Sequence, residues 1–139
     1  MYVNMFRLIY VSSASWDLND QQLVALLDQS VVNNRRDGIT GALAYHDRSF
    51  FQVLEGSELA VIYLLKRIVM DERTYNVSVV HQGPVEDRLF QDWSMAWVPA
   101  EELQKTGFDL HIMRLRKTSD MILDSILDAF RHTVRLKPM

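Results

Sequence analysis

The order of apolar patterns along the chain restricts its fold more than any other feature. Two-residue alternation predicts strands at residues 6–11, 39–45, 50–54, 77–80 and 93–98. Three- and four-residue spacing predicts two amphipathic helices, one from Asn19 to Gly38 and one from Ser57 to about Asp71. This βαββαββ order is typical of a ferredoxin-like α+β fold. We therefore expect a five-stranded mixed sheet with both helices on one face.

After Pro99 the pattern becomes helical. A short helix is expected at 99–106 and a longer one at 119–135. The longer helix would carry an apolar stripe of Leu123, Ile126, Leu127, Phe130 and Val134. This stripe needs a surface to cover, either the bare face of the sheet or another subunit. With 139 residues in all, we expect one domain at 1–98 and a C-terminal helical extension at 99–139.

Composition excludes several classes of function. The chain has 15 basic and 18 acidic residues, so it lacks the basic excess of a nucleic-acid binder. It has no cysteine, and its four histidines are far apart, so neither a disulfide nor a metal site is expected. No apolar run approaches the roughly 18–20 residues of a membrane span, and the N-terminus does not resemble a signal peptide. A cytoplasmic location without membrane contact is therefore expected.

Several polar residues interrupt the apolar side of the sheet that should face the two helices. Tyr10 and Gln52 lie mid-strand, and Asn34 extends the apolar stripe of the first helix. Arg67 and Asp71 lie one turn apart at the end of the second helix. A buried glutamine without a partner costs about 1–3 kcal/mol, so partners are expected. The pattern predicts a small-molecule site between the helices and does not identify its ligand.

Each of these residues also has an ordinary interpretation when it is taken alone. Tyr10 fits a core tyrosine whose hydroxyl reaches water, and Gln52 fits an edge or solvent-facing position. Arg67 and Asp71 fit an exposed ion pair, and Asn34 fits a residue near a helix end. These alternatives stay open on pattern alone.

Four short runs together resemble the BLUF domains, the blue-light sensors that use FAD. They are RLIY at 7–10, NNxxDGITG at 33–41, FQVLEG at 51–56 and DWSM at 92–95. The resemblance covers about residues 5–98 in the family's order. No single run is decisive, but the four together, with Tyr10 and Gln52 both present, are specific.

The resemblance implies that the flavin ring of FAD lies between the two helices. Asn34 would bind the N3–H and C4 carbonyl region of the ring, and Gln52 would lie between Tyr10 and the N5/O4 edge. Leu26 and Ile68 would sandwich the ring. Further cofactor-binding positions implied by the family are Ser30, Asn33, Arg67, Asp71 and Arg73.

The resemblance also implies light-driven signalling without net chemistry. Tyr10 would give an electron and a proton to the excited flavin through Gln52, and Gln52 would then rearrange by rotation, tautomerisation or both. A new hydrogen bond to flavin O4 would shift its absorption to the red. Trp93 and Met95 on the fifth strand would exchange places or roles and pass the signal to the C-terminal helices.

The output is expected to act in trans. About 40 residues follow the sensor region, too few for a catalytic effector domain, and they contain no catalytic motif. We expect a non-enzymatic sensor that acts on a separate protein and forms a homo-oligomer, either a dimer or a larger ring. Two alternatives remain at this stage: a flavin-dependent oxidoreductase, and a ferredoxin-like protein-interaction domain without productive flavin.

Overall fold

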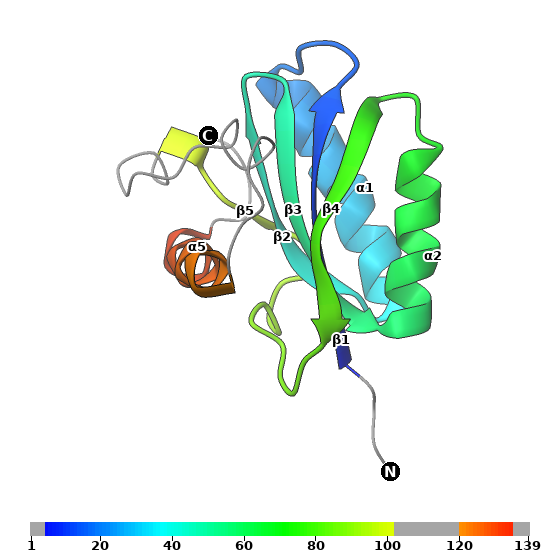
Figure 1. Cartoon of the computed structure of the whole chain (residues 1–139). Helices are drawn as coiled ribbons and strands as arrows, with labels where there is room; N and C mark the ends of the chain where they lie inside the picture. Colours follow the sequence, from blue (N-terminus) through cyan, green and yellow to red (C-terminus); the bar gives the residue numbers. More distant parts are fainter. Residues whose placement is uncertain (1–4, 102–119, 135–139) are drawn as a thin grey trace.

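The computed structural model describes residues 5–101 and 120–134, and it has three layers (Figure 1). A five-stranded sheet lies between two helices on one face and a third helix on the other (Figure 1). The elements are β1 (Met5–Ala14), α1 (Asp20–Asp37), β2 (Thr40–His46), β3 (Ser49–Ser57), α2 (Glu58–Val69), β4 (Thr74–Pro84), β5 (Ala96–Trp97) and α5 (Asp120–Thr133).

The strand order is β4-β1-β3-β2-β5. All paired strands are antiparallel except β5, which runs parallel to β2. The predicted ferredoxin-like α+β fold with a mixed sheet is therefore confirmed. Because β1 and β3 are both interior strands, side chains that face α1 and α2 from these strands lie deep inside the molecule.

Local side-chain chemistry determines where the helices begin and end. Asn19 Oδ1 accepts a hydrogen bond from the amide of Gln22 at 2.9 Å, and the Gln22 side chain accepts one from the amide of Asn19 at 3.0 Å. Gly38 ends α1 in the left-handed region, at φ 69°, which glycine adopts without strain. Ser57 caps α2 by accepting from the amide of Ala60.

Each face of the sheet has its own apolar core. On one face, residues of β1 and β3 such as Leu8 and Leu54 pack with α1 and α2. On the other face, Phe51 packs against Phe130 of α5, with their ring centroids 4.9 Å apart. Ile126, Leu127 and Phe130 are buried and Val134 packs against the same core, so this part of the predicted apolar stripe covers the bare face of the sheet. The side chain of Leu123, also predicted for the stripe, lies outside the described residues. Most of the expected helix at 99–106 lies outside the described residues.

The fifth strand is shorter than the predicted 93–98, and Trp93 does not lie on the same face as Met95 and Trp97, as two-residue alternation over that range would require. β5 has only two residues, because turns occupy the preceding segment: the amide of Trp93 donates to the carbonyl of Phe90 at 3.0 Å. These turns break the two-residue alternation. As a result Met95 and Trp97 face the α1–α2 core, whereas Trp93 packs against the α5 core.

The fourth strand is much longer than the predicted 77–80. It pairs with β1 from Thr74 to Pro84, with register irregularities on the way. Asn76, at φ 52°, lies near one of them. β4 is at the edge of the sheet and is largely exposed, so its ends carry little apolar signal and alternation detects only its middle.

Candidate functional site

Tyr10, Gln52 and Met95 form a buried hydrogen-bonded chain on the helix-facing side of the sheet. Tyr10 on β1 and Gln52 on β3 are direct cross-strand partners, and both side chains are buried. The Tyr10 hydroxyl donates to Gln52 Oε1, and Gln52 Nε2 donates to the Met95 sulfur at 3.5 Å. The amide is therefore oriented by a phenol at one end and a thioether at the other.

The environment of Tyr10 keeps its phenol protonated. Burial removes the hydroxyl from water, which raises its pKa, and the negative charge of Asp71 raises the pKa further. A neutral phenol retains both its proton and its donor role toward Gln52. This tyrosine can therefore release a proton only together with an electron or to a strong base.

A cavity of about 220 Å³ opens beside this chain, between α1 and α2. The structure brings all ten residues predicted to bind the cofactor to its wall: Tyr10, Leu26, Ser30, Asn33, Asn34, Gln52, Arg67, Ile68, Asp71 and Arg73. Of the two further residues predicted to be photoactive, Met95 contacts Gln52, whereas Trp93 lies with the opposite core. Their photochemical and ligand-binding roles stay predictions.

Six other residues line the cavity without having been predicted: Ser12, Gln29, Leu43, Phe50, Leu64 and Thr74. Some of them carried a usable signal. Ser12 follows Tyr10 by two residues on a strand, so alternation places both on one face. Phe50 precedes Gln52 by the same step. Gln29 and Thr74 had no such signal, because they lie at the rim of the cavity, where periodicity carries little information.

Two polar residues of α1 have partners inside the protein. Asn34, 3 % exposed, donates from Nδ2 to the carbonyl oxygen of Ser94 at 2.9 Å. The Ser30 hydroxyl donates to the carbonyl of Leu26, one turn earlier, at 2.8 Å. Asn34 therefore links the helix that lines the cavity to the segment that leads into Met95.

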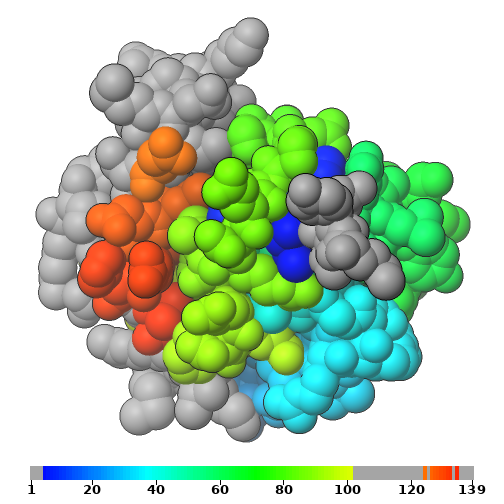
Figure 2. Space-filling model, turned by 90° about the horizontal axis from the view of Figure 1, so that it is seen from below, coloured from blue at the N-terminus to red at the C-terminus, as the bar shows by residue number. Residues whose placement is uncertain are grey.

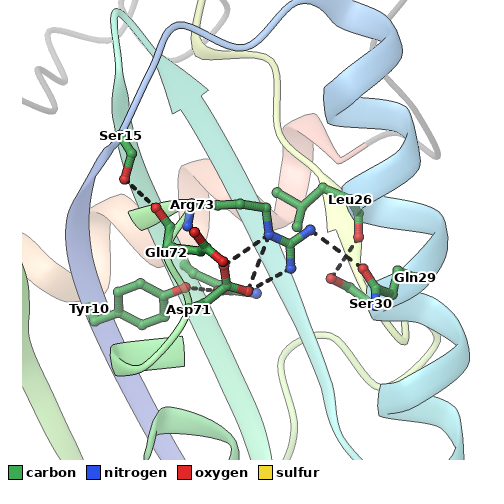
Figure 3. Close-up of polar contacts among 9 residues, drawn as sticks. Tyr10, Ser15, Leu26, Gln29, Ser30, Asp71, Glu72 and Arg73 are labelled. Atoms are coloured by element: carbon green, nitrogen blue, oxygen red, sulfur yellow. Dashed lines mark hydrogen bonds and ion pairs between the residues drawn. The ribbon is translucent and has the colours of Figure 1, made fainter. Parts of the chain in front are cut away.

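Arg73 extends across the rim of the cavity from the turn after α2 toward α1 (Figure 3). Its guanidinium donates to Asp71 Oδ2 at 2.6 Å and to the Gln29 side chain at 3.5 Å. Hydrogen bonds from Arg73 hold the pKa of Asp71 below its ordinary value. The carboxylate considered as a partner of Arg67 is thus held by Arg73.

The cavity suits a flat molecule with apolar faces and a polar edge. Leu26 and Ile68 offer apolar contacts from the two helices, while Asn34 on α1 and Gln52 on β3 offer amide groups. The Ser12 hydroxyl is 1 % exposed and lacks a hydrogen-bond partner among the described residues. A buried hydroxyl of this kind is expected to gain a partner when a ligand fills the site. A flavin ring matches this donor set.

Within residues 5–101 and 120–134, none of the helices combines the length and apolar character needed to cross a bilayer. The same residues contain no group of three or more His, Asp or Glu side chains arranged to hold a metal ion.

Comparison with known proteins agrees with this geometry. Residues 5–96 match the BLUF family model, described as sensors of blue light using FAD. Photoactivated adenylate cyclase subunit beta of Euglena gracilis is 33 % identical over 94 residues, which are 66 % of this chain but 11 % of that protein. The blue light- and temperature-regulated antirepressor BluF of Escherichia coli is 31 % identical over 115 residues, 80 % of this chain and 25 % of that one.

Solved structures with a similar fold come from the same family. The dark-state structure of BlrB, a BLUF protein, superimposes with a TM-score of 0.79 at 26 % identity, over 94 % of this chain and 98 % of BlrB. The chain thus spans only a small part of the curated relatives and nearly the whole of this solved one. It belongs to the BLUF family and is a blue-light photoreceptor that uses FAD.

Proposed function

We propose that Tyr10, Gln52 and Met95 are the photoactive residues of this receptor. The observation that carries this proposal is the continuous hydrogen-bonded chain from the Tyr10 phenol through the Gln52 amide to the Met95 sulfur. When bound, the flavin absorbs blue light and is a strong electron acceptor while excited. Tyr10 can release an electron, and its phenolic proton has Gln52 Oε1 as an acceptor already in contact.

Gln52 is the residue that converts this transfer into a lasting change. Its amide has chemically different ends, a carbonyl that accepts and an NH₂ that donates. A rearrangement of the amide exchanges these ends between Tyr10 and Met95. When the electron and proton return to Tyr10, the altered hydrogen bonds around Gln52 remain, and no net reaction has occurred. The light signal is thus stored as a hydrogen-bond pattern.

We place the output in the segment before β5 and in the C-terminal helix. Met95 contacts Gln52 on one face of the sheet, and the neighbouring Trp93 packs against the core that contains α5 on the other face. This segment therefore contacts the cores on both faces. Residues 1–98 would act as the sensor and 99–139 as the output extension. The relatives carry different outputs, a cyclase subunit and an antirepressor by name. For this chain we propose no enzymatic activity, a separate effector protein and a homo-oligomeric assembly.

Absorption spectroscopy on the purified protein tests this proposal. Spectra are recorded in darkness, after blue light and during recovery. A flavin spectrum that shifts to the red and returns without bleaching is the expected result. Bleaching with steady oxidation of NAD(P)H would instead support an oxidoreductase. Protein that stays colourless after addition of FAD would support an interaction domain.

A further inference from the structure

Glu55 is a fully buried carboxylate that the proposed photochemistry does not use. It lies on β3, on the face of the sheet that α5 covers, and its side chain is 0 % exposed. Arg7 Nε donates to Glu55 Oε2 at 2.9 Å. The backbone amides of Leu89 and Phe90 also donate to the carboxylate, at 3.0 and 2.9 Å. Such charge-assisted hydrogen bonds are short and strong.

Two partners of Glu55, Leu89 and Phe90, begin the segment that ends at Met95, the hydrogen-bond partner of the photoactive glutamine. This segment, residues 89–95, is tied at its first end to Glu55. Its last residue, Met95, accepts a hydrogen bond from Gln52. Between the two ends, the Asn34 side chain donates to the backbone carbonyl of Ser94 at 2.9 Å. The carboxylate and the photoactive amide are therefore two fixed points on β3 that the same short segment connects.

The segment also lies next to the C-terminal helix. Phe90 is 1 % exposed and belongs to the same core as Phe130 of α5. Figure 2 shows the yellow-green residues that follow β4 between α5, in orange and red, and α1, in cyan. A displacement of the segment would thus be felt on both faces of the sheet, because close-packed cores transmit it.

We infer that Glu55 is a positioning residue of the photocycle, whose carboxylate fixes the 89–95 segment and thereby the contact of Met95 with Gln52. This inference rests on the proposed function, since it concerns the same glutamine. We call the hydrogen bonds from Leu89 and Phe90 to the Glu55 carboxylate the clamp. Removing the clamp loosens Met95, so the rearranged Gln52 is less well held and returns to its dark arrangement sooner. The effect is therefore on the rate of recovery, rather than on flavin binding.

The test compares Glu55→Gln with Glu86→Gln. Glutamine keeps the size of the side chain but presents an NH₂ group to donors, so part of the clamp loses its acceptor. Glu86 is an exposed carboxylate in the loop between β4 and the 89–95 segment, so the same substitution there serves as the matched control. Hydrogen exchange of the amides of residues 89 and 90 in darkness measures the clamp, and the decay of the red shift after blue light measures recovery.

We expect faster amide exchange and a recovery rate raised roughly threefold to tenfold in Glu55→Gln, with an unchanged dark flavin spectrum. Faster exchange with a recovery rate equal to that of Glu86→Gln would overturn the inference, because the clamp would be lost without consequence. Should Glu55→Gln not fold, Arg7→Lys weakens the clamp more mildly and is expected to change recovery in the same direction. Wild-type protein without any photocycle would overturn the proposed function as well.

Discussion

Tyr10 and Gln52 are opposite each other in the register of two neighbouring antiparallel strands. The sheet itself therefore sets the separation of their backbones, since directly opposed residues have Cβ atoms about 4.5–5.5 Å apart. Hydrogen bonding of the strands holds the phenol and the amide in contact before any ligand arrives. A donor and an acceptor that are positioned in advance need little rearrangement when charge moves.

Replacement of Tyr10 by phenylalanine is expected to abolish the red shift while flavin stays bound. The substitution removes the hydroxyl that donates to Gln52 and leaves the ring that lines the cavity. Absorption spectra before and after blue light measure the shift. Tyr45→Phe is the matched control, because Tyr45 is also buried but donates to Asp17, away from the cavity wall. A normal photocycle in Tyr10→Phe would refute the role of this tyrosine.

Replacement of Met95 by alanine is expected to weaken output while the red shift still forms, although the red shift decays faster because Gln52 loses this contact. Met95 is 2 % exposed and is the contact of Gln52 on the side away from Tyr10. Loss of the thioether leaves the contact between Tyr10 and Gln52 in place but removes the sulfur that accepts a hydrogen bond from the Gln52 amide. Hydrogen exchange of α5 in darkness and under blue light measures output, and Met70→Ala, at an exposed methionine, is the control. Unaltered light-dependent exchange in α5 would count against this route.

Sequence patterns predicted the elements that repeat a simple period and those that a cap defines. The helix from Asn19 to Gly38 was predictable to within a residue, because both of its ends use side-chain or glycine chemistry that is local. The segment before β5 was not predictable by periodicity. Its course depends on long-range partners, among them the carboxylate of Glu55 and the amide of Asn34, and alternation carries no information about them.

Some residues of the cavity could likewise be predicted from the sequence pattern, and others could not. Residues at its centre stood out because a polar group among apolar neighbours on a regular element is conspicuous, as with Gln52 between Phe50 and Leu54. The ion pair between Asp71 and Arg73 did not stand out, since it lies in the turn after α2. In a turn no face is defined until the chain has folded.

Replacement of Phe130 by alanine is expected to lower the free energy of unfolding by about 3–5 kcal/mol. Phe130 is completely buried, and its ring makes a T-shaped contact with the ring of Phe51 on the sheet. Urea unfolding measures the loss, with Arg131→Ala, at an exposed position on the same helix, as the control. A loss below about 1 kcal/mol would show that α5 adds little to the stability of the sheet, because a fully buried phenylalanine removed from a real core costs more.

The ion pair at the rim of the cavity predicts how stability depends on pH. Arg73 lowers the pKa of Asp71 in the folded protein, so the carboxylate holds its proton less tightly there than in the unfolded chain. Its contribution to stability is therefore present above the ordinary aspartate pKa of about 3.9. It is lost as pH falls through the lower, folded-state value.

Asp71→Asn removes this titrating group, so its difference in unfolding free energy from wild type is expected to be largest near pH 7 and to shrink in acid. Urea unfolding at a series of pH values from about 7 to about 2 measures this difference. Arg73→Gln removes the partner that lowers the pKa, so it is expected to reduce the same acid dependence while leaving the carboxylate in place. A difference between wild type and Asp71→Asn that stays constant across this range would mean that the ion pair does not form in solution.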